Sequence, residues 1–188
     1  MRIVAGTAGG RRLRVPPRGT RPTSERVREA LFSRLEHLGY LDSTLVLDLY
    51  AGSGALGLEA VSRGAARVVL VESARLAVAA CRANIAAAGL GDRVQLRGTT
   101  VAHYLAGPPP PDPFDLVLCD PPYAAAVQDD LEELARPGWL ARDAMVVLER
   151  DQRSAAPQWP TGWEPLDARR YGETTLHTAR VPSGAPGK

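Results

Sequence analysis

The sequence has few cysteines, histidines and aromatic residues, and it has no long hydrophobic run. Its 188 residues include two cysteines, three histidines and 5% aromatic residues. Cys81 and Cys119 lie in apolar segments without metal-like spacing, which argues against a disulfide framework or a zinc site. No stretch approaches the about 20 apolar residues of a membrane span, and no signal-peptide core follows the first residues. We therefore expect a soluble, unprocessed, cytoplasmic protein without a bound metal.

Lysine is nearly absent, since 22 arginines stand beside a single lysine. Only the placement of the basic residues is therefore informative. Residues 1–40 carry nine arginines and three glutamates, a balance of +6, so the remaining 148 residues account for −4 of the net charge of +2. A local arginine excess on a mildly acidic body is typical of a protein that binds a phosphate backbone. The alternative is an arginine-rich surface that only faces solvent.

The first 40 residues predict a small basic extension followed by a helix. Residues 2–15 read as a β-hairpin with a glycine-rich turn, and residues 16–22 as an extended connector. Thr23 or Ser24 can cap the helix, which is expected to end at Gly39. Its apolar stripe comprises Val27, Leu31, Leu35 and Leu38. Because the helix rather than the extension should cover the core, a chain that starts near residue 20 is expected to fold.

From residue 45 onward, short apolar strands alternate with helices. Strands are predicted at 45–50, 67–72, 94–96, 114–119 and 144–149, and helices at 58–61, 76–88, 101–105 and 127–135. Residues 164–180 predict a terminal hairpin around a Tyr-Gly-Glu turn. This order predicts an α/β fold with a mostly parallel sheet, an antiparallel edge hairpin and helices on both faces. We expect an α/β domain over residues 23–182 and a disordered tail over 183–188.

A glycine-rich loop after the first predicted strand indicates a nucleotide site. Gly52, Gly54 and Gly57 have the spacing that lets a backbone turn sharply beside a ligand, and Glu72 lies 20 residues after Gly52, where it can bind ribose hydroxyls. The same spacing serves NAD and S-adenosylmethionine. Asp48, which could meet a cationic ligand end, and the absence of a second domain favour S-adenosylmethionine.

The second constellation is the segment Asp120-Pro121-Pro122-Tyr123, which ends an apolar strand. Asp120 can accept hydrogen bonds from an exocyclic amine, and Pro121 offers a carbonyl without a competing N–H. Tyr123 offers a ring on which a base can stack, a contact worth about 1–3 kcal/mol. The segment therefore predicts a clamp for the amino group of a base, although Asp and Pro are also common in plain turns.

These motifs resemble those of known enzymes. The segment from Asp48 to Gly57, Glu72 and the Asp-Pro-Pro-Tyr segment are similar to the cofactor-binding and catalytic motifs of Rossmann-like class I amino-methyltransferases. The basic block at residues 2–13 and the segment 21–32 resemble the RsmD-type family, which methylates the N2 amine of a guanine in bacterial small-subunit 16S rRNA.

The resemblance implies S-adenosylmethionine as cofactor, 16S rRNA in an assembled or assembling 30S subunit as partner, and a monomer. The implied catalytic residues are Asp120, Pro121, Pro122 and Tyr123. The implied cofactor-binding residues are Asp48, Tyr50, Gly52, Gly54, Gly57, Glu72, Thr99 and Thr100. The implied RNA-binding residues are Arg2, Arg11, Arg12, Arg14, Arg18, Arg21 and Arg26. The family often places an adenine-binding Asp after the third strand, where this chain has Arg97-Gly98-Thr99-Thr100.

Several alternatives stay open from the residues alone. Asp120 can orient the amine or also accept its proton. Cys119 could be a nucleophile, but a buried inert thiol is the favoured interpretation of its place at the end of an apolar strand. The clamp recognises an amine rather than a whole base, and so it also permits adenine N6 as the target, or DNA as the substrate. More remote are an NAD-dependent oxidoreductase and a non-catalytic RNA-binding module.

Overall fold

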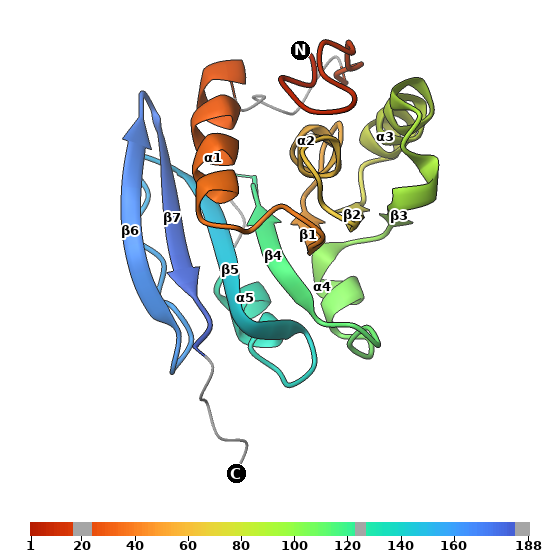
Figure 1. The fold of residues 1–188 in the computed structure, drawn as a ribbon. Coiled ribbons are helices and arrows are strands. Elements are labelled where there is room, and N and C mark those ends of the chain that lie inside the picture. Colours follow the sequence, from red (N-terminus) through yellow and green to blue (C-terminus); the bar gives the residue numbers. More distant parts are fainter. Residues whose placement is uncertain (17–23, 123–126, 183–188) are drawn as a thin grey trace.

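A seven-stranded sheet forms the centre of the molecule in the computed structural model, which describes residues 1–16, 24–122 and 127–182 (Figure 1). The strands are β1 Leu45–Leu49, β2 Arg67–Glu72, β3 Val94–Gly98, β4 Phe114–Cys119, β5 Leu140–Asp151, β6 Glu164–Tyr171 and β7 Thr174–Arg180. The helices are α1 Glu25–His37, α2 Ala55–Ser62, α3 Arg75–Ala88, α4 Val101–Leu105 and α5 Gln128–Leu134, with a 3-10 turn at Gly91–Arg93.

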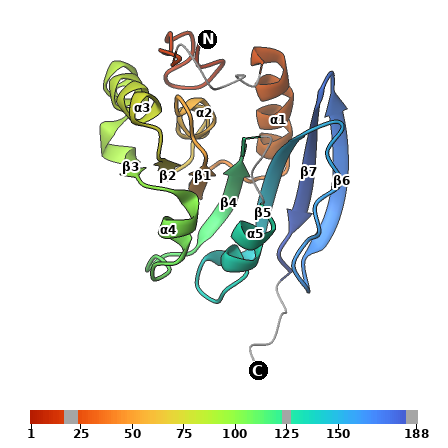
Figure 2. The ribbon, with the colours of Figure 1, turned by 180° about the vertical axis from the view of Figure 1, so that it is seen from behind.

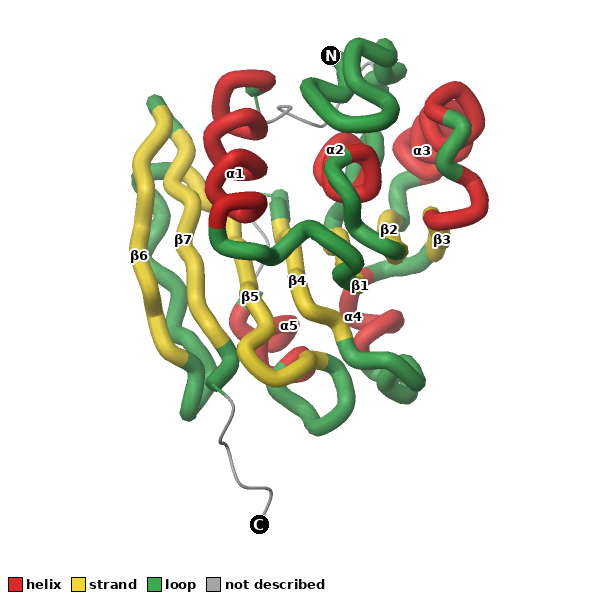
Figure 3. Tube along the Cα trace, viewed as in Figure 1, coloured by secondary structure: helices red, strands yellow, loops and turns green. Residues whose placement is uncertain are grey.

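The strand order is β3-β2-β1-β4-β5-β7-β6 (Figure 3). The first five strands in this order pair in parallel, whereas β7 pairs antiparallel with both β5 and β6. The predicted mostly parallel sheet with an antiparallel edge is therefore confirmed. The order reverses between β1 and β4, and in open α/β sheets ligands bind at the carboxyl ends of the strands at such a switch point.

Two layers of helices cover the two faces of the sheet. Helices α1, α2 and α3 lie on one face of the sheet, and α4 and α5 lie on the other (Figures 1 and 2). Their side chains form one buried cluster with each face. Because both faces are covered, the central strands read as continuous apolar runs rather than alternating ones. None of the helices in the described part of the chain is long and apolar enough to cross a membrane.

Helix α1 follows the prediction except at its last apolar position. Ser24 caps the helix, since its Oγ accepts the N–H of Val27 at 3.2 Å. Val27, Leu31 and Leu35 are buried as expected. Leu38, however, lies beyond the last helical residue and is 45% exposed. Its place on the predicted stripe was wrong because the helix ends one residue before it.

The N-terminal segment, residues 1–16, packs against α2 and α3 rather than standing apart. The hairpin expected there is reduced to a single antiparallel bridge between Arg2 and Arg12. Ile3, Ala8 and Leu13 are buried in the main core cluster. The segment therefore belongs to the folded body, which removes the basis for expecting a chain that starts near residue 20 to fold unimpaired.

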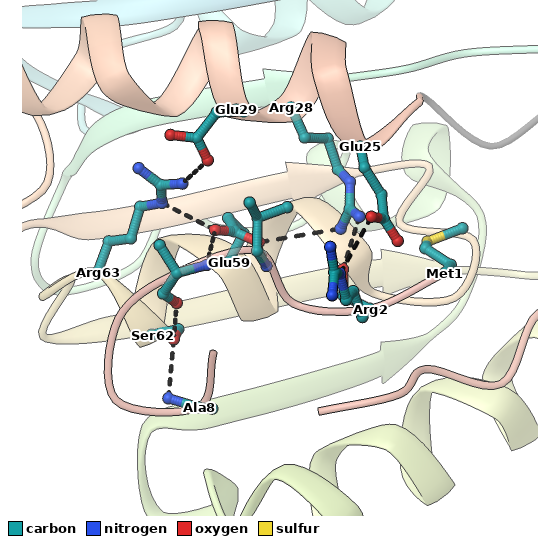
Figure 4. Close-up of polar contacts among 12 residues, drawn as sticks. Met1, Arg2, Ala8, Glu25, Arg28, Glu29, Glu59, Ser62 and Arg63 are labelled. Carbon is teal, nitrogen blue, oxygen red and sulfur yellow. Dashed lines mark hydrogen bonds and ion pairs between the residues drawn. The ribbon is translucent and has the colours of Figure 1, made fainter. Parts of the chain in front are cut away.

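Helix α2 supplies the hydrogen-bond partners that a second strand would otherwise offer to this segment. The Glu59 carboxylate accepts the N–H groups of Val4 at 2.7 Å and Ala5 at 3.0 Å (Figure 4). The Ser62 hydroxyl accepts the N–H of Ala8 at 2.9 Å. Gly6 has a φ of +80°, and a Cβ there would lie 1.9 Å from the Ser62 carbonyl oxygen, so only glycine fits this approach.

A buried charge cluster lies between α1, α2 and the N-terminal segment. Glu59 and Arg28 are both 0% exposed, and the Arg28 guanidinium lies 3.9 Å from the Glu59 carboxylate (Figure 4). Arg28 also donates to the Arg2 carbonyl oxygen at 2.6 Å. Arg63 completes the cluster, with Nε donating to Glu59 at 2.8 Å and Nη2 donating to Glu29 at 2.6 Å. Burial lowers the pKa of Arg28, although the negative charge of Glu59 opposes this.

Candidate active site

A cleft of about 900 Å³ opens at the carboxyl ends of the parallel strands, at the switch point of the sheet. One wall consists of the loop after β1 and the start of α3, including Gly52 and Glu72. The opposite wall consists of the end of β5 and the β6–β7 turn. Asp120, Pro121 and Pro122 lie between these walls. The glycine-rich loop with Glu72 and the Asp-Pro-Pro segment, which the sequence singled out separately, therefore line the same cleft.

The glycine-rich loop has backbone angles that require glycine. Gly52 has a φ of 57° and Gly54 a φ of 79°, both in the left-handed region. Gly57 lies in the first turn of α2, and a Cβ there would lie 2.3 Å from a methyl of Leu70 on β2. The first two glycines shape the loop, and the third lets α2 pack closely on the sheet.

Asp48 lies beneath this loop and does not line the cleft. Its Oδ2 accepts the N–H of Gly57 at 2.8 Å, and its Oδ1 is buried without a hydrogen-bond partner among the described residues. Burial, opposed by the Gly57 hydrogen bond and reinforced by the charge of Glu72, raises the pKa of Asp48 to about 7. This position supports a role in holding the loop rather than the predicted contact with a cationic ligand end.

Replacement of Asp48 by Asn is expected to flatten the pH dependence of stability. Between pH 3.8, the ordinary carboxyl pKa, and about pH 7, Asp48 is ionised in the unfolded chain but protonated in the folded chain. The contribution of Asp48 to the free energy of unfolding therefore falls as the pH rises through this range, and it is constant above it. Asn cannot ionise and keeps the acceptor for Gly57. Chemical denaturation across this range should show the variant gaining stability relative to the wild type with rising pH. Parallel curves for the two proteins would contradict the raised pKa.

Glu72 ends β2 with a carboxylate that three backbone groups hold in place. Its oxygens accept the N–H groups of Gly52 at 2.8 Å, Ser73 at 2.8 Å and Ala74 at 2.7 Å. The side chain thereby ties the glycine-rich loop to the start of α3 while it lines the cleft. A carboxylate fixed in this way retains acceptor capacity for hydroxyl groups of a ligand. Its predicted role toward the ribose hydroxyls fits this geometry.

Glu72→Ala is expected to weaken S-adenosylmethionine binding, because each lost hydrogen bond to a charged group is worth about 1.5–3 kcal/mol. Glu72→Gln should lose less, since its amide oxygen still accepts. Isothermal titration calorimetry measures both, with Glu132→Ala, an exposed glutamate of α5, as the matched control. Unchanged affinity in the Ala variant would remove Glu72 from the cofactor site.

The Asp-Pro-Pro segment begins directly after β4. The Asp120 N–H donates to the Leu49 carbonyl oxygen of β1 at 3.4 Å, which ties the segment to the neighbouring strand. Pro121 is buried and Pro122 is exposed, and both line the cleft. Tyr123 lies outside the described residues, so its stacking role stays a prediction.

Tyr50 and the two threonines of the predicted cofactor set differ in position. Tyr50 lines the cleft, and its hydroxyl donates to Asp130 of α5 at 2.5 Å. Burial, together with Asp130, raises the pKa of Tyr50. Thr99 and Thr100 do not line the cleft; the Thr100 hydroxyl instead caps α4 by accepting the N–H of His103 at 3.2 Å. Their contact with the cofactor stays a prediction that this geometry does not support.

The structure supports the interpretation of Cys119 as an inert thiol. Cys119 is 2% exposed at the end of β4. Burial, followed by the nearby carboxylates of Asp130, Asp120 and Asp48, raises its pKa well above the ordinary value, so the nucleophilic thiolate is disfavoured.

The N-terminal segment reaches the cleft at its two ends, since Met1 and Pro16 line the cleft wall, whereas none of the segment's arginines lines it. Arg11, Arg12 and Arg14 are exposed, as is Arg26 on α1. Arg2 is also 59% exposed, although its Nε donates to Glu25 at 3.1 Å. Arg18 and Arg21 lie outside the described residues.

Sequence reasoning missed two groups of cleft residues. The first comes from the N-terminal side and includes Met1, Val27 and Arg28. The second comes from the end of β5 and the β6–β7 turn. No local motif marks either group, because both reach the cleft only through sheet pairing and helix packing.

The sheet order and the two motifs at its switch point define a Rossmann-like class I methyltransferase domain. Comparison with known proteins narrows this class. The family model described as "Conserved hypothetical protein 95" matches residues 1–180. The chain is 35% identical over 165 residues to ribosomal RNA small subunit methyltransferase D of Escherichia coli K12, covering 87% of this chain and 81% of that protein. The enzyme of the same name from Haemophilus influenzae is 31% identical over 175 residues, covering 92% and 89%.

A solved structure agrees with these relatives. The methyltransferase yhhF from Escherichia coli superposes with a TM-score of 0.84 at 32% identity, covering 98% of this chain and 99% of that one. The chain belongs to the RsmD-type family of ribosomal RNA small subunit methyltransferases. The predicted family is thereby confirmed, and the predicted cofactor, S-adenosylmethionine, agrees with this membership.

Proposed function

We propose that this protein transfers the methyl group of S-adenosylmethionine to the exocyclic N2 amine of a guanine in 16S rRNA, at guanine-966 of the small ribosomal subunit. The observation that carries this proposal is the Asp120-Pro121 segment in the same cleft as the Glu72-bound glycine loop. The names of the relatives support rRNA as the substrate class.

One group of cleft residues would bind the methyl donor, and another would bind the guanine that accepts the methyl group. Glu72 and the glycine-rich loop would hold the nucleoside part of S-adenosylmethionine, which supplies a methyl group already activated on a sulfonium. The Asp120 carboxylate and the Pro121 carbonyl would accept hydrogen bonds from the guanine NH2. These bonds draw the amine nitrogen toward tetrahedral geometry and aim its lone pair at the methyl carbon. Positioning and charge placement can then supply most of the rate enhancement.

The proton balance places one further demand on the cleft. When the N–C bond forms, the S–C bond breaks, and the methylated nitrogen becomes an acidic ammonium that must lose a proton. Asp120 lines the cleft where this nitrogen would lie and can accept the proton directly or through water. In the described residues no group of three or more His, Cys, Asp or Glu side chains could hold a metal.

The natural substrate is proposed to be an assembled or assembling 30S subunit, methylated by a monomer in the cytoplasm. A ribosomal particle presents its phosphates in fixed positions, which suits an arginine-bearing segment that is itself bonded to α2 and reaches the cleft at its two ends. The particle should therefore be a better substrate than short naked RNA.

Labelling of 30S particles with tritiated S-adenosylmethionine, followed by mapping of the labelled nucleotide, tests the proposed function. The particles should come from cells that lack the endogenous enzyme. Label on N2 of a single guanine is the expected result. Label on adenine N6 would support the broader amino-methyltransferase alternative, and binding of NAD without S-adenosylmethionine would support an oxidoreductase. RNA binding without transfer would indicate a non-catalytic module.

Replacement of Arg11, Arg12 and Arg14 by Ser should weaken RNA binding and reduce its salt dependence while leaving cofactor affinity intact. The slope of log affinity against log salt changes by up to about 0.9 per phosphate contact in duplex and about 0.7 in single strands. Binding isotherms at several salt concentrations measure the slope. The charge-matched control replaces Arg67, Arg93 and Arg142, which lie near the starts of β2, β3 and β5 at the opposite end of the sheet. Equal slopes for the two triple variants would show that the segment only faces solvent.

A further inference from the structure

The parallel pairing of β4 and β5 sets two acidic residues side by side. Cys119 pairs with Leu148, so Asp120 and Glu149 are the next residues along the two neighbouring strands. Strands in a sheet lie about 4.8 Å apart. Both residues line the cleft.

The alternation of side chains places both carboxylates on the same face. Leu118 lies two residues before Asp120, and Val147 lies two residues before Glu149. Both belong to the same buried cluster, the one on the face that α1 and α2 cover. Because side chains alternate with a period of two, Asp120 and Glu149 continue on that face.

The Glu149 carboxylate has a partner that fixes its direction. The Thr174 hydroxyl donates to its Oε1 at 3.2 Å. Thr174 begins β7 directly after the turn that lines the cleft, and it pairs with Asp151 of β5. Glu149 is therefore held by the antiparallel edge of the sheet, whereas Asp120 is held by the β1 side.

Two neighbouring carboxylates match one edge of guanine and mismatch adenine. Guanine presents the N2 amine next to the N1–H, which are adjacent hydrogen-bond donors. Adenine presents the N6 amine next to N1, which is an acceptor. Ionised carboxylates only accept hydrogen bonds, so a carboxylate beside the amine clamp pairs with N1–H of guanine and repels the N1 lone pair of adenine.

We propose that Glu149 is the specificity-determining residue of the cleft and that it accepts the N1–H of the target guanine while Asp120 holds the N2 amine. This inference rests on the proposed function and adds to it the means by which guanine is told from adenine. An acceptor at Glu149 also fixes the orientation of the base. Two hydrogen bonds along one edge of the base, to the N2 amine and to N1–H, prevent the rotation that a single hydrogen bond would allow.

The test compares guanine with 2,6-diaminopurine at the target position of reconstituted 30S particles. The analogue keeps the 2-amino group but has an unprotonated N1. Wild-type enzyme should favour guanine by about 10- to 100-fold in kcat/KM, the range expected for one base-edge contact. Glu149→Gln should reduce this preference at least severalfold, because its amide can donate to N1 of the analogue. Thr174→Val should reduce the preference less.

Glu132→Gln is the matched control, since Glu132 is an exposed glutamate of α5 that does not line the cleft. It should keep the wild-type preference. Unchanged preference in Glu149→Gln, with normal S-adenosylmethionine affinity, would overturn the assignment of Glu149 but not the proposed function. An equal loss of preference in Glu132→Gln would overturn the assignment too. A wild-type enzyme that methylates adenine N6 instead would overturn both this assignment and the proposed function.

Discussion

Asp120→Ala is expected to abolish most methyl transfer while S-adenosylmethionine binds almost as in the wild type. Asp120 lines the cleft at the end of β4, whereas the hydrogen bonds that shape the cofactor loop come from Glu72 and Asp48. Loss of one preorganised group that acts on the reacting atom typically costs about 100- to 1,000-fold in rate. Single-turnover methylation of 30S particles, together with calorimetric cofactor binding, measures the two effects separately.

Asp120→Asn separates orientation from proton acceptance. The amide oxygen of Asn can still accept a hydrogen bond from the guanine amine, so this variant should retain more activity than the Ala variant. Equal rates in the two variants would show that charge or proton acceptance outweighs geometry at this position. A large loss of cofactor affinity in either variant would instead place Asp120 in the cofactor site.

The placement of both motifs in one cleft could be predicted from the sequence. Each motif follows an apolar run that reads as a buried parallel strand, and the carboxyl ends of such strands lie at one edge of the sheet. Glu72 was recognisable because its spacing from Gly52 reflects one β-α-β unit. Local periodicity and motif spacing therefore sufficed for Gly52, Glu72 and Asp120.

The wall formed by β5 and β7 could not be predicted in the same way. The sequence indicated a strand over 144–149, where the apolar run stops, but β5 extends over Leu140–Asp151. Its last residues are polar and stay in the sheet because β7 pairs with them, as in the Asp151–Thr174 pair. Strand ends are set by such partners rather than by the strand's own composition, so Glu149 gave no signal of a role.

The docking of the N-terminal segment was also beyond local reasoning. Glu59 and Ser62 bind backbone groups more than 50 residues earlier in the chain. Arg28 lies one position from the predicted apolar stripe, yet it is 0% exposed. A charged side chain in an amphipathic helix reads as solvent-facing unless its buried partner is known. Here the partners are Glu59 and the carbonyl oxygen of Arg2.

Glu59→Ala is expected to be among the most destabilising single substitutions in this protein. Glu59 is 0% exposed and accepts two backbone N–H groups and the Arg63 guanidinium, while Arg28 lies 3.9 Å away. Removal of one member of a buried ion pair typically costs about 3–5 kcal/mol, because the remaining charge stays buried without compensation. Urea denaturation should show this loss, and Glu132→Ala, an exposed glutamate of α5, should stay within about 0.5 kcal/mol of wild type.

The contacts of Glu59 with the N-terminal segment should also affect RNA binding. Glu59 holds the N-terminal segment onto α2, the helix that begins at the cofactor loop, so its loss should reduce RNA affinity more than S-adenosylmethionine affinity. Glu59→Gln keeps the shape and one acceptor oxygen, and its stability and RNA affinity should fall between those of the wild type and the Ala variant. If the Ala variant unfolded at the wild-type urea concentration and bound RNA with the wild-type salt slope, Glu59 would not anchor the segment. The arginines of the segment would then owe their position to its other contacts, such as the burial of Ile3 and Leu13.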